Sequence, residues 1–483
     1  MVKRQIILAP QALLPSKDDP QAATIEIDLS LGTIISIKEG IIPPLQEEDV
    51  EIIKIEDDKI VLPGLIDTHV HLNQPGRTEW EGFQTGTLAA ISGGVTTLID
   101  MPLNSIPPTT TLKGLEIKRK EALKIGINSD LGFWGGIIPG NQGELVNMLN
   151  NGVKGFKCFL IDSGVEEFPH VEEEDLIKAC EALKGTNALI LFHAELDDSN
   201  PCIPTSTKNE NSHSHSHNHS SSSSSQSSYS KFLESRPEEF ELKALKLIIK
   251  FTKLYPELNF HIVHLSSSNA IPLIKKAKFS ENIKNLTIET CFHYLCLSSE
   301  LILNDDFKTE FKCCPPIRSE LNRKRLIENL LEDSSKNEKN ENIINYIVSD
   351  HSPCIPELKK GNFLESWGGI SSLGLGLSLL FNEIGNKIKL GKLINFLSIN
   401  QAKQVNLKNK GELKIGNQAD FIIFNPNVKW TVTTESLLFK NKISPYIGKT
   451  LKGRVEKTYL AGQLVWDYEK GIDGAVLSQG RLL

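Results

Sequence analysis

Residues 64–73 read Gly-Leu-Ile-Asp-Thr-His-Val-His-Leu-Asn, and this stretch decides the fold that the sequence predicts. The apolar run at residues 60–66 predicts a buried strand that leads into His69 and His71. Residues i and i+2 of a strand point to the same face, so both imidazoles leave the strand end on one side. Neutral imidazole binds zinc and similar cations. Taken alone, the pair is equally compatible with two hydrogen-bonded surface histidines.

Short apolar, β-rich runs recur along the chain, with helical stretches such as 242–254 and 321–331 between them. Short buried strands that alternate with helices predict a parallel sheet, and eight such units predict a closed (β/α)8 TIM barrel. Polar side chains cluster just past the ends of these runs, where the active sites of such barrels lie. The eight runs are residues 61–66, 95–100, 130–134, 152–159, 188–192, 260–263, 286–289 and 346–348.

The two ends of the chain differ from its middle. Residues 1–62 and 405–483 contain short strands separated by glycine-rich turn signals, which predict one small β-sandwich domain built from both termini. The barrel then occupies residues 63–404. A Ser- and His-rich tract at about 205–230 interrupts it, and such a composition predicts a disordered surface insertion. An accessory metal tether is the alternative for its alternating histidines.

Composition narrows the class of function. The 53 basic and 60 acidic residues give a formal net charge of −7, which favours a small-molecule substrate over nucleic acid or a membrane. No stretch of 18 apolar residues is present, so we expect no membrane span. The eight cysteines form no Cys-x-x-Cys pair. This usage is typical of a reduced, cytoplasmic protein.

Histidine, lysine and aspartate side chains follow five of the predicted strands. A barrel brings the C-terminal ends of its strands together at one opening, so these side chains can converge there. Zinc sites need nitrogen and oxygen ligands with positions left open for water and substrate. Two such cations would clamp an attacking hydroxide and a substrate carbonyl. The candidate metal ligands are His69, His71, Lys157, His193, His264 and Asp350.

This order of residues on eight strands resembles the amidohydrolase superfamily, in the cyclic-amidohydrolase branch of dihydroorotases, hydantoinases, dihydropyrimidinases and allantoinases. The resemblance runs from Pro63-Gly-Leu-Ile-Asp67 to Gly416-Asn-Gln-Ala-Asp420. It implies two divalent metal ions, with zinc expected, and a homotetramer. It also implies that Lys157, rather than Lys154, is carboxylated by CO2 and bridges the metals.

The same resemblance assigns the remaining ligands. His69, His71 and Asp350 would hold one metal, and His193 and His264 would hold the other. Asp350 would also act as the catalytic base, because a carboxylate beside the hydroxide can pass its proton to the departing nitrogen.

Within the branch, the chain is most similar to the allantoinases, through residues 71–83, 155–165, 312–318, 349–359 and 367–371. This similarity implies hydrolysis of the ring amide of allantoin to allantoate by a metal-activated hydroxide, a step of purine catabolism. A hydantoinase or dihydropyrimidinase is the alternative enzyme. However, the loop at 160–164 lacks the tyrosine of that group. A non-catalytic scaffold paralogue is the remaining alternative, and it should lack ligands.

Substrate contacts are expected from four residues. Asn73 stands where dihydroorotases carry an arginine for the substrate carboxylate, which argues against a carboxylate-bearing ring. Asn104 could reach the substrate or serve only as a turn residue before two prolines. The other two candidates are His293 and Ser352.

Three residues depart from the family pattern. Gln74 replaces an acidic residue, and Phe292 and Gln401 each replace a proline. None is a metal ligand, so we expect them to change local loop shape more than chemistry.

Overall fold

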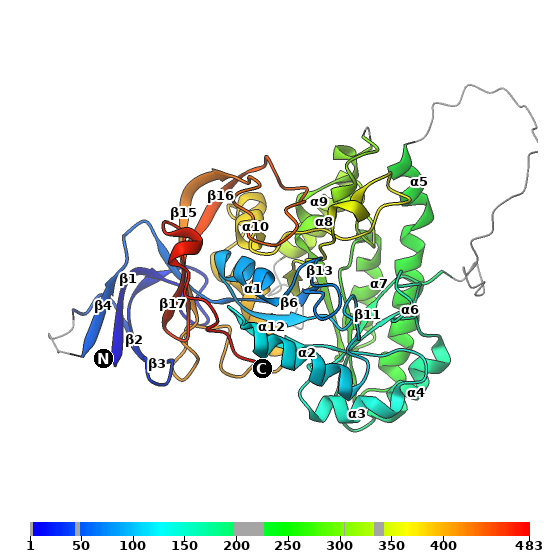
Figure 1. Ribbon diagram of the computed structural model, residues 1–483, viewed down its shortest axis with the longest axis horizontal. Coiled ribbons are helices and arrows are strands. Elements are labelled where there is room, and N and C mark those ends of the chain that lie inside the picture. The colour runs from blue at the N-terminus through cyan, green and yellow to red at the C-terminus, as the bar shows by residue number, and fades with distance from the viewer. Residues whose placement is uncertain (1–2, 44–48, 198–226, 304, 333–341) are drawn as a thin grey trace, which may run out of the picture.

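A computed structural model describes residues 3–43, 49–197, 227–303, 305–332 and 342–483. Figure 1 shows a large α/β unit in which helices surround a set of strands, and a β-domain beside it. The β-domain combines the blue N-terminal strands with the orange and red C-terminal strands. Of the helices described, none is long and apolar enough to cross a membrane.

The strands of the large unit run parallel and pair in chain order, in arcs of three and six strands. Only Trp134 separates the end of the first arc from the start of the second. On the other side, a parallel bridge joins Val70 to His351. The predicted α/β-barrel architecture is confirmed. Its strands are β6 (Leu65–Val70), β7 (Val95–Asp100), β8 (Asp130–Phe133), β9 (Gly135–Gly136), β10 (Phe156–Phe159), β11 (Leu189–His193), β12 (Asn259–Ile262), β13 (Leu286–Cys291) and β14 (Tyr346–Val348).

The strand predicted at 61–66 is two strands in two different sheets. β5 (Ile60–Pro63) pairs antiparallel with β15 (Phe421–Thr431), whereas β6 belongs to the barrel. At the crossing point, a Cβ on Gly64 would lie 2.3 Å from Thr96 Oγ1, so only glycine fits. Pro63-Gly64 marks the break in the sequence, but both flanking strands are buried and apolar, so the run was interpreted as one strand.

The β-domain forms from both ends of the chain, as predicted. Its strands hydrogen-bond as one sheet in the order β17-β16-β15-β5-β1-β2-β3, with β4 paired to β1, around an apolar cluster that includes Ile25 and Phe421. The exact domain boundaries stay a prediction. The remaining strands are β1 (Arg4–Ala12), β2 (Gln21–Asp28), β3 (Thr33–Glu39), β4 (Val50–Lys54), β16 (Thr450–Leu460) and β17 (Gln463–Asp467).

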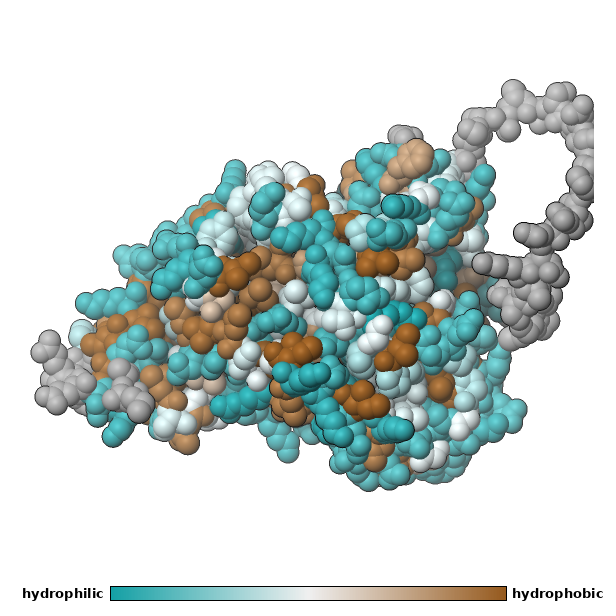
Figure 2. All heavy atoms as spheres, in the orientation of Figure 1, coloured by the Kyte–Doolittle hydropathy of each residue, from teal (hydrophilic) through white to brown (hydrophobic). Residues whose placement is uncertain are grey.

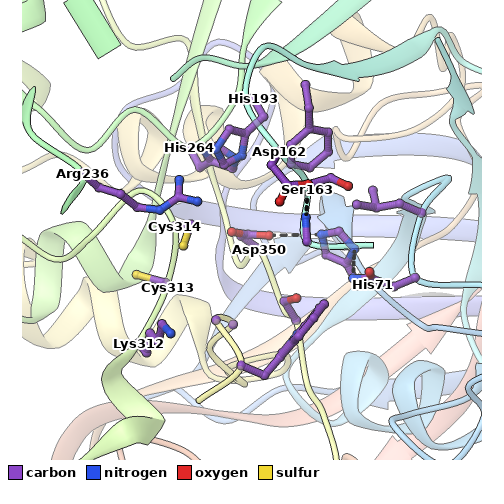
Figure 3. A pocket seen from close by; sticks show the side chains of 18 of the residues that line it. His71, Asp162, Ser163, His193, Arg236, His264, Lys312, Cys313, Cys314 and Asp350 are labelled. Carbon is purple, nitrogen blue, oxygen red and sulfur yellow. Dashed lines mark hydrogen bonds and ion pairs between the residues drawn. The ribbon is translucent and has the colours of Figure 1, made fainter. Parts of the chain in front are cut away.

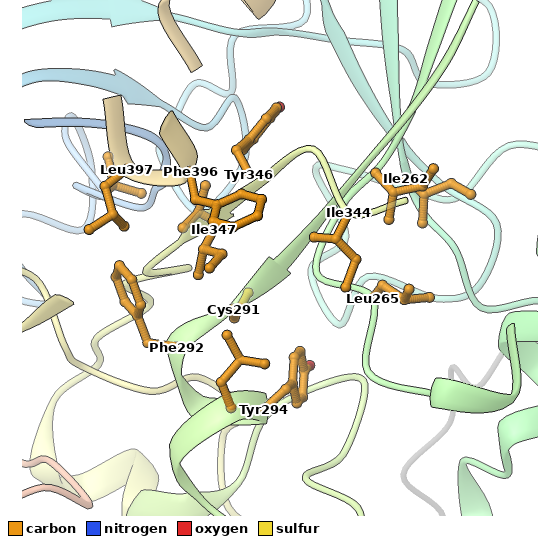
Figure 4. Close-up of a cluster of buried hydrophobic side chains, with 14 of the residues drawn as sticks. Ile262, Leu265, Cys291, Phe292, Tyr294, Ile344, Tyr346, Ile347, Phe396 and Leu397 are labelled. Atoms are coloured by element: carbon orange, nitrogen blue, oxygen red, sulfur yellow. The ribbon is translucent and has the colours of Figure 1, made fainter. Parts of the chain in front are cut away.

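Helices cover the barrel strands, and two of them coincide with the helical segments that the sequence predicts at 242–254 and 321–331. Part of the core that they enclose lies around Cys291, Tyr346 and Phe396 (Figure 4). The helices are α1 (Phe83–Ser92), α2 (Leu112–Ile125), α3 (Gln142–Asn150), α4 (Glu173–Leu183), α5 (Ser228–Ser235), α6 (Glu238–Leu254), α7 (Ile271–Lys275), α8 (Phe292–Cys296), α9 (Glu320–Leu331), α10 (Gly376–Ile384), α11 (Leu390–Ile394) and α12 (Asn400–Gln404).

Two of the three residues that depart from the family pattern, Gln401 and Gln74, form buried hydrogen bonds that connect parts of the fold. The buried Gln401 side chain accepts hydrogen bonds from Thr68 N and Oγ1, at 2.9 and 3.0 Å, and donates to Ile347 O at 2.9 Å. It therefore links β6 to β14, where the barrel ladder has only a single bridge. Gln74 Oε1 accepts a hydrogen bond from Phe83 N and so pairs a free N–H at the start of α1.

The predicted insertion ends earlier than 230. Residues 205–226 lie outside the described part of the chain, but Ser228–Ser230 already belong to α5. Ser227 caps this helix, because its Oγ accepts a hydrogen bond from Ser230 N at 3.3 Å. Serine is common both in polar tracts and at helix N-caps, so composition alone could not locate the boundary.

Candidate metal centre

The first group of candidate ligands lies where β6 and β14 end side by side. His69 is in β6, His71 follows it, and Asp350 follows β14. Asp350 Oδ1 lies 3.1 Å from His69 Nε2 and 3.4 Å from His71 Nε2. All three residues are buried and offer ligand atoms within 4.8 Å of one another. The sequence prediction that these residues converge is therefore matched by the geometry.

The donor chemistry of this group fits a divalent cation. His69 Nδ1 lies 2.5 Å from Glu289 Oε1. The carboxylate thus holds the proton on Nδ1 and leaves a lone pair on Nε2, facing Asp350. Lone pairs that face one another repel unless a positive charge lies between them. Without such a charge this neutral form is not favoured: burial lowers the pKa of His69, but the Asp350 and Glu289 carboxylates outweigh it and raise this pKa to about 9. A bound metal ion would take the place of the proton on Nε2.

His193 and His264 form a second group, at the ends of β11 and β12. Their ring centroids are 4.6 Å apart, and the His264 ring lies 5.5 Å from that of His69. Burial lowers the pKa of His193 to about 4 and that of His264 well below its ordinary value. Both rings are therefore neutral. His264 Nδ1 is buried and has no hydrogen-bond partner among the described residues, so its lone pair is available to bind a metal ion.

Lys157 lies in β10 between the two groups, and Lys154 does not. The Lys157 side chain is buried and lines the same cavity as the histidines, whereas Lys154 precedes β10 and lines a different cavity. Burial lowers the pKa of Lys157 to about 8. A lowered pKa increases the fraction of neutral amine, which is the form that reacts with CO2.

The two groups and Lys157 share one cavity of about 390 Å³ (Figure 3). Two residues that line it, His264 and Asp350, have φ angles of +41° and +44°. Such left-handed backbone is costly for residues other than glycine and gathers at functional sites. The cavity lies past the C-terminal ends of the barrel strands, the position that the sequence predicts.

A family model described as "Amidohydrolase family" matches residues 60–465. The chain belongs to the amidohydrolase family. An allantoinase of Saccharomyces cerevisiae is 44% identical to this amidohydrolase over 95% of this chain and 94% of that protein. An allantoinase of Streptomyces avermitilis is 38% identical over 89% and 91% of the two chains.

Solved structures agree on the architecture. The L-hydantoinase (dihydropyrimidinase) of Arthrobacter aurescens superposes with a TM-score of 0.83, over 99% of each chain. Its identity of 22% makes this a likeness of fold alone. Family membership implies a hydrolase that uses divalent metal ions, and the ligand group at His69, His71 and Asp350 suits that use.

The amidohydrolase cavity includes two of the four predicted substrate contacts, Asn104 and Ser352. Asn104 Nδ2 also lies 3.5 Å from His71 Nδ1, which suits a residue that orients this imidazole. Asn73 does not line the cavity: its φ is +61° and its Nδ2 donates to Pro353 O at 3.3 Å. His293 does not line it either.

His293 is fully buried and packs edge-on against Tyr294, with ring centroids 4.2 Å apart. Both of its ring nitrogens lack a hydrogen-bond partner among the described residues. Its ligand atom lies within 4.8 Å of those of Cys291 and Asp350, so it is close to a candidate ligand without lining the cavity.

Sequence reasoning assigned no role to the carboxylates that support the imidazoles. Glu289 Oε1 contacts His69, and Glu195 Oε2 lies 2.6 Å from His193 Nε2. Glu195 stands only two residues after His193, which was an available signal, because metal-binding histidines commonly donate their other N–H to a carboxylate. Two cavity-lining residues, Arg236 and Trp367, were also missed. Nothing local marks Arg236, whereas Trp367 begins one of the segments that resemble the allantoinases but was given no role.

Proposed function

We propose that this amidohydrolase is an allantoinase, which hydrolyses the ring amide of allantoin to give allantoate. The main support for this proposal is the 44% identity to a named allantoinase over nearly the whole of both chains. It is supported by the six candidate ligands, which are buried side chains that all line one cavity. A scaffold that had lost catalysis would not be expected to keep all six.

The proposal includes two divalent metal ions, with zinc expected. His69, His71 and Asp350 would hold one, His193 and His264 the other, and Lys157, as its carbamate, would contact both. Bound divalent ions supply a lowered pKa for water and polarisation of the substrate carbonyl.

In this proposal Asp350 transfers the proton. Burial raises its pKa, but His69 and His71 outweigh this effect and hold the pKa of Asp350 well below its ordinary value. It is therefore a carboxylate at neutral pH and can accept a proton from the attacking water. The same oxygen can then deliver that proton to the departing ring nitrogen.

Recognition of a neutral ring with a ureido arm needs hydrogen-bonding groups more than a strong cation. The cavity wall offers Asn104, Ser163 and Ser352, and we assign substrate contacts to Asn104 and Ser352. His293 and Asn73 are buried and do not line the cavity, so we assign them no direct substrate contact. Gly164 and Asp162 occupy the loop in which hydantoinases carry a tyrosine, which favours allantoin.

The test compares four cyclic amides side by side on metal-loaded protein: allantoin, hydantoin, dihydrouracil and dihydroorotate. We expect the highest kcat/KM with allantoin and little turnover of dihydroorotate. A preference for hydantoin or dihydrouracil would replace the proposal with the hydantoinase alternative. No turnover of any of the four by protein with bound metal would favour the scaffold alternative.

We also propose a cytoplasmic homotetramer. The seven cysteines in the described residues are free thiols, as expected in a reducing compartment. Figure 2 shows hydrophobic side chains gathered on the β-domain, where Ile35, Ile52 and Ile472 are exposed. Exposed apolar patches mark interaction surfaces. Light scattering after size-exclusion chromatography gives the oligomer mass, and fractionation of cells gives the compartment.

A further inference from the structure

Arg236 contacts the carboxylate that holds a candidate metal ligand. Its Nη1 lies 2.5 Å from Glu195 Oε2, and the same oxygen lies 2.6 Å from His193 Nε2. Arg236 also lines the cavity, and Figure 3 shows its side chain extending toward Cys314 on the side of His193 and His264. One oxygen atom therefore joins a cation at the cavity wall to an imidazole of the second ligand group.

This contact determines which nitrogen of His193 can bind a metal. Glu195 accepts the Nε2 proton, so the lone pair lies on Nδ1. Phe159 stacks on the His193 ring, with centroids 4.6 Å apart and planes 14° apart. The ring plane and the tautomer are therefore both set by neighbours. Glu195 is fully buried, and a buried carboxylate without a cation is strongly disfavoured. Arg236 supplies the guanidinium that contacts this carboxylate directly.

Arg236 is itself held by the helix that precedes it. Tyr229 of α5 is buried and donates from its hydroxyl to Ile317 O at 2.6 Å. At the start of the same helix, Ser228 N donates to Asp306 Oδ1 at 2.7 Å. Residues 198–226 lie between Glu195 and Arg236 in the sequence, so the ion pair joins the two ends of this segment. A backbone bond from Leu196 N to Phe240 O, at 3.1 Å, reinforces that junction.

The ligand group formed by His69, His71 and Asp350 is held by a different set of hydrogen bonds. Glu289, which holds His69, has its second oxygen 3.0 Å from His261 Nε2. Tyr346 OH lies 2.9 Å from that same nitrogen. No arginine takes part in the interactions described for Glu289. The two groups are thus supported independently, and a change at Arg236 should affect only one of them.

We propose that Arg236 is a positioning residue that, through Glu195, holds His193 for the second metal ion. The proposal rests on the two-metal centre of the proposed function. It predicts that loss of Arg236 weakens one metal position and leaves the one at His69, His71 and Asp350 occupied.

The experiment compares Arg236→Gln, Arg236→Lys and Arg323→Gln with the wild type. Arg323 is a matched control, because its side chain is 17% exposed against 20% for Arg236, and it pairs with Glu320 at 2.6 Å and Glu383 at 3.3 Å. Metal per chain is measured by mass spectrometry after dialysis against a chelator. The melting temperature, kcat and KM are measured on the same samples.

We expect Arg236→Gln to fall from two metals toward one per chain, with kcat reduced about 10- to 100-fold and KM changed little. Arg236→Lys should recover part of the second metal, and it also provides the test if the Gln variant does not fold. Arg323→Gln should keep both metals even if its melting temperature falls.

If Arg236→Gln retains both metals after the same dialysis as the wild type, the proposal is overturned. A higher KM with unchanged metal content would also overturn it and would make Arg236 a substrate contact. A wild-type protein that holds fewer than two metals and hydrolyses no cyclic amide would refute the proposed function itself, so the two failures are distinguishable.

Discussion

At the residue scale, Lys157 is the most demanding part of the proposed centre. Its amine is buried between histidines and a carboxylate, and burial lowers its pKa to about 8. An ammonium between two cations would repel both, so the proposal requires the carbamate anion. We expect Lys157→Ala to abolish turnover and to hold well below two metals per chain. A short carboxylic acid added to the solution should restore part of both. Two bound metals and wild-type turnover without added acid would contradict the carbamate bridge.

A change of one atom can distinguish the role of Asp350 as a general base from its role as a metal ligand. Asp350→Asn keeps the size of the side chain and one oxygen, but the amide cannot accept a proton. We therefore expect the fold and much of the metal to remain while kcat falls about 100- to 10,000-fold, the usual contribution of a general base. Circular dichroism and metal analysis control for folding and loading. Near-normal kcat with metals bound would exclude Asp350 as the base.

At the element scale, Gln401 connects β6 and β14 through hydrogen bonds to Thr68 and Ile347. Gln401→Ala should leave their buried backbone groups unpaired, at a cost of about 1–3 kcal/mol each. Urea unfolding measures the loss. The control is Gln404→Ala on the same helix, because Gln404 is only partly buried and bonds to the Thr287 hydroxyl. Equal losses in the two variants would show that Gln401 has no special role.

The start of helix α5 marks the boundary between a segment that we expect to be dispensable for folding and activity and a segment that both require. Deletion of residues 205–226 should leave kcat and melting temperature close to wild type, because such polar tracts form few packing contacts. Deletion of 205–230 should lower both, because it also removes the Ser227 cap, the Ser228–Asp306 bond and the buried Tyr229. A large effect of the shorter deletion would show that the tract is structural.

At the scale of the whole molecule, a buried ion cluster links the barrel to the β-domain. Lys410 Nζ lies 2.7 Å from Asp130 of β8 and 2.6 Å from Asp420, next to β15. Lys410→Met should leave two facing carboxylates and destabilise the protein by about 3–5 kcal/mol. Lys389→Met is the control, since its pair with Asp19 is exposed and contributes little.

The loss in Lys410→Met should depend on pH. Burial raises the pKa of Asp420, and Lys410 opposes this effect, so removal of Lys410 raises the pKa further. A carboxyl group with a raised pKa binds more protons in the folded than in the unfolded state, and the variant therefore gains stability as pH falls. Urea unfolding at about pH 5 and pH 8 should show a smaller deficit at the lower pH. A larger deficit there would reverse this reasoning.

The barrel class, the β-domain built from both termini and the order of the candidate ligands could all be predicted from the residues alone. These features are local: a buried strand is a short apolar run, and a ligand at its end is adjacent to that run in the chain. His69, Lys157 and Asp350 could therefore be assigned to strand ends without coordinates. The same reasoning placed the end of the insertion too late, at about 230, because serine is common both in polar tracts and at the N-caps of helices.

The residues that surround those ligands could be identified only from the folded chain. Glu289 contacts His69 from 220 positions away, and Gln401 bonds to Thr68 from 333 positions away. The division of one apolar run between two sheets at Gly64 depended in the same way on a distant strand, β15. Which residues pair in this way depends on how the sheets bring remote backbone together, and local residue types do not specify the partner. The physical reason is that burial and hydrogen-bond partners are properties of the packed molecule, whereas periodicity is a property of the chain.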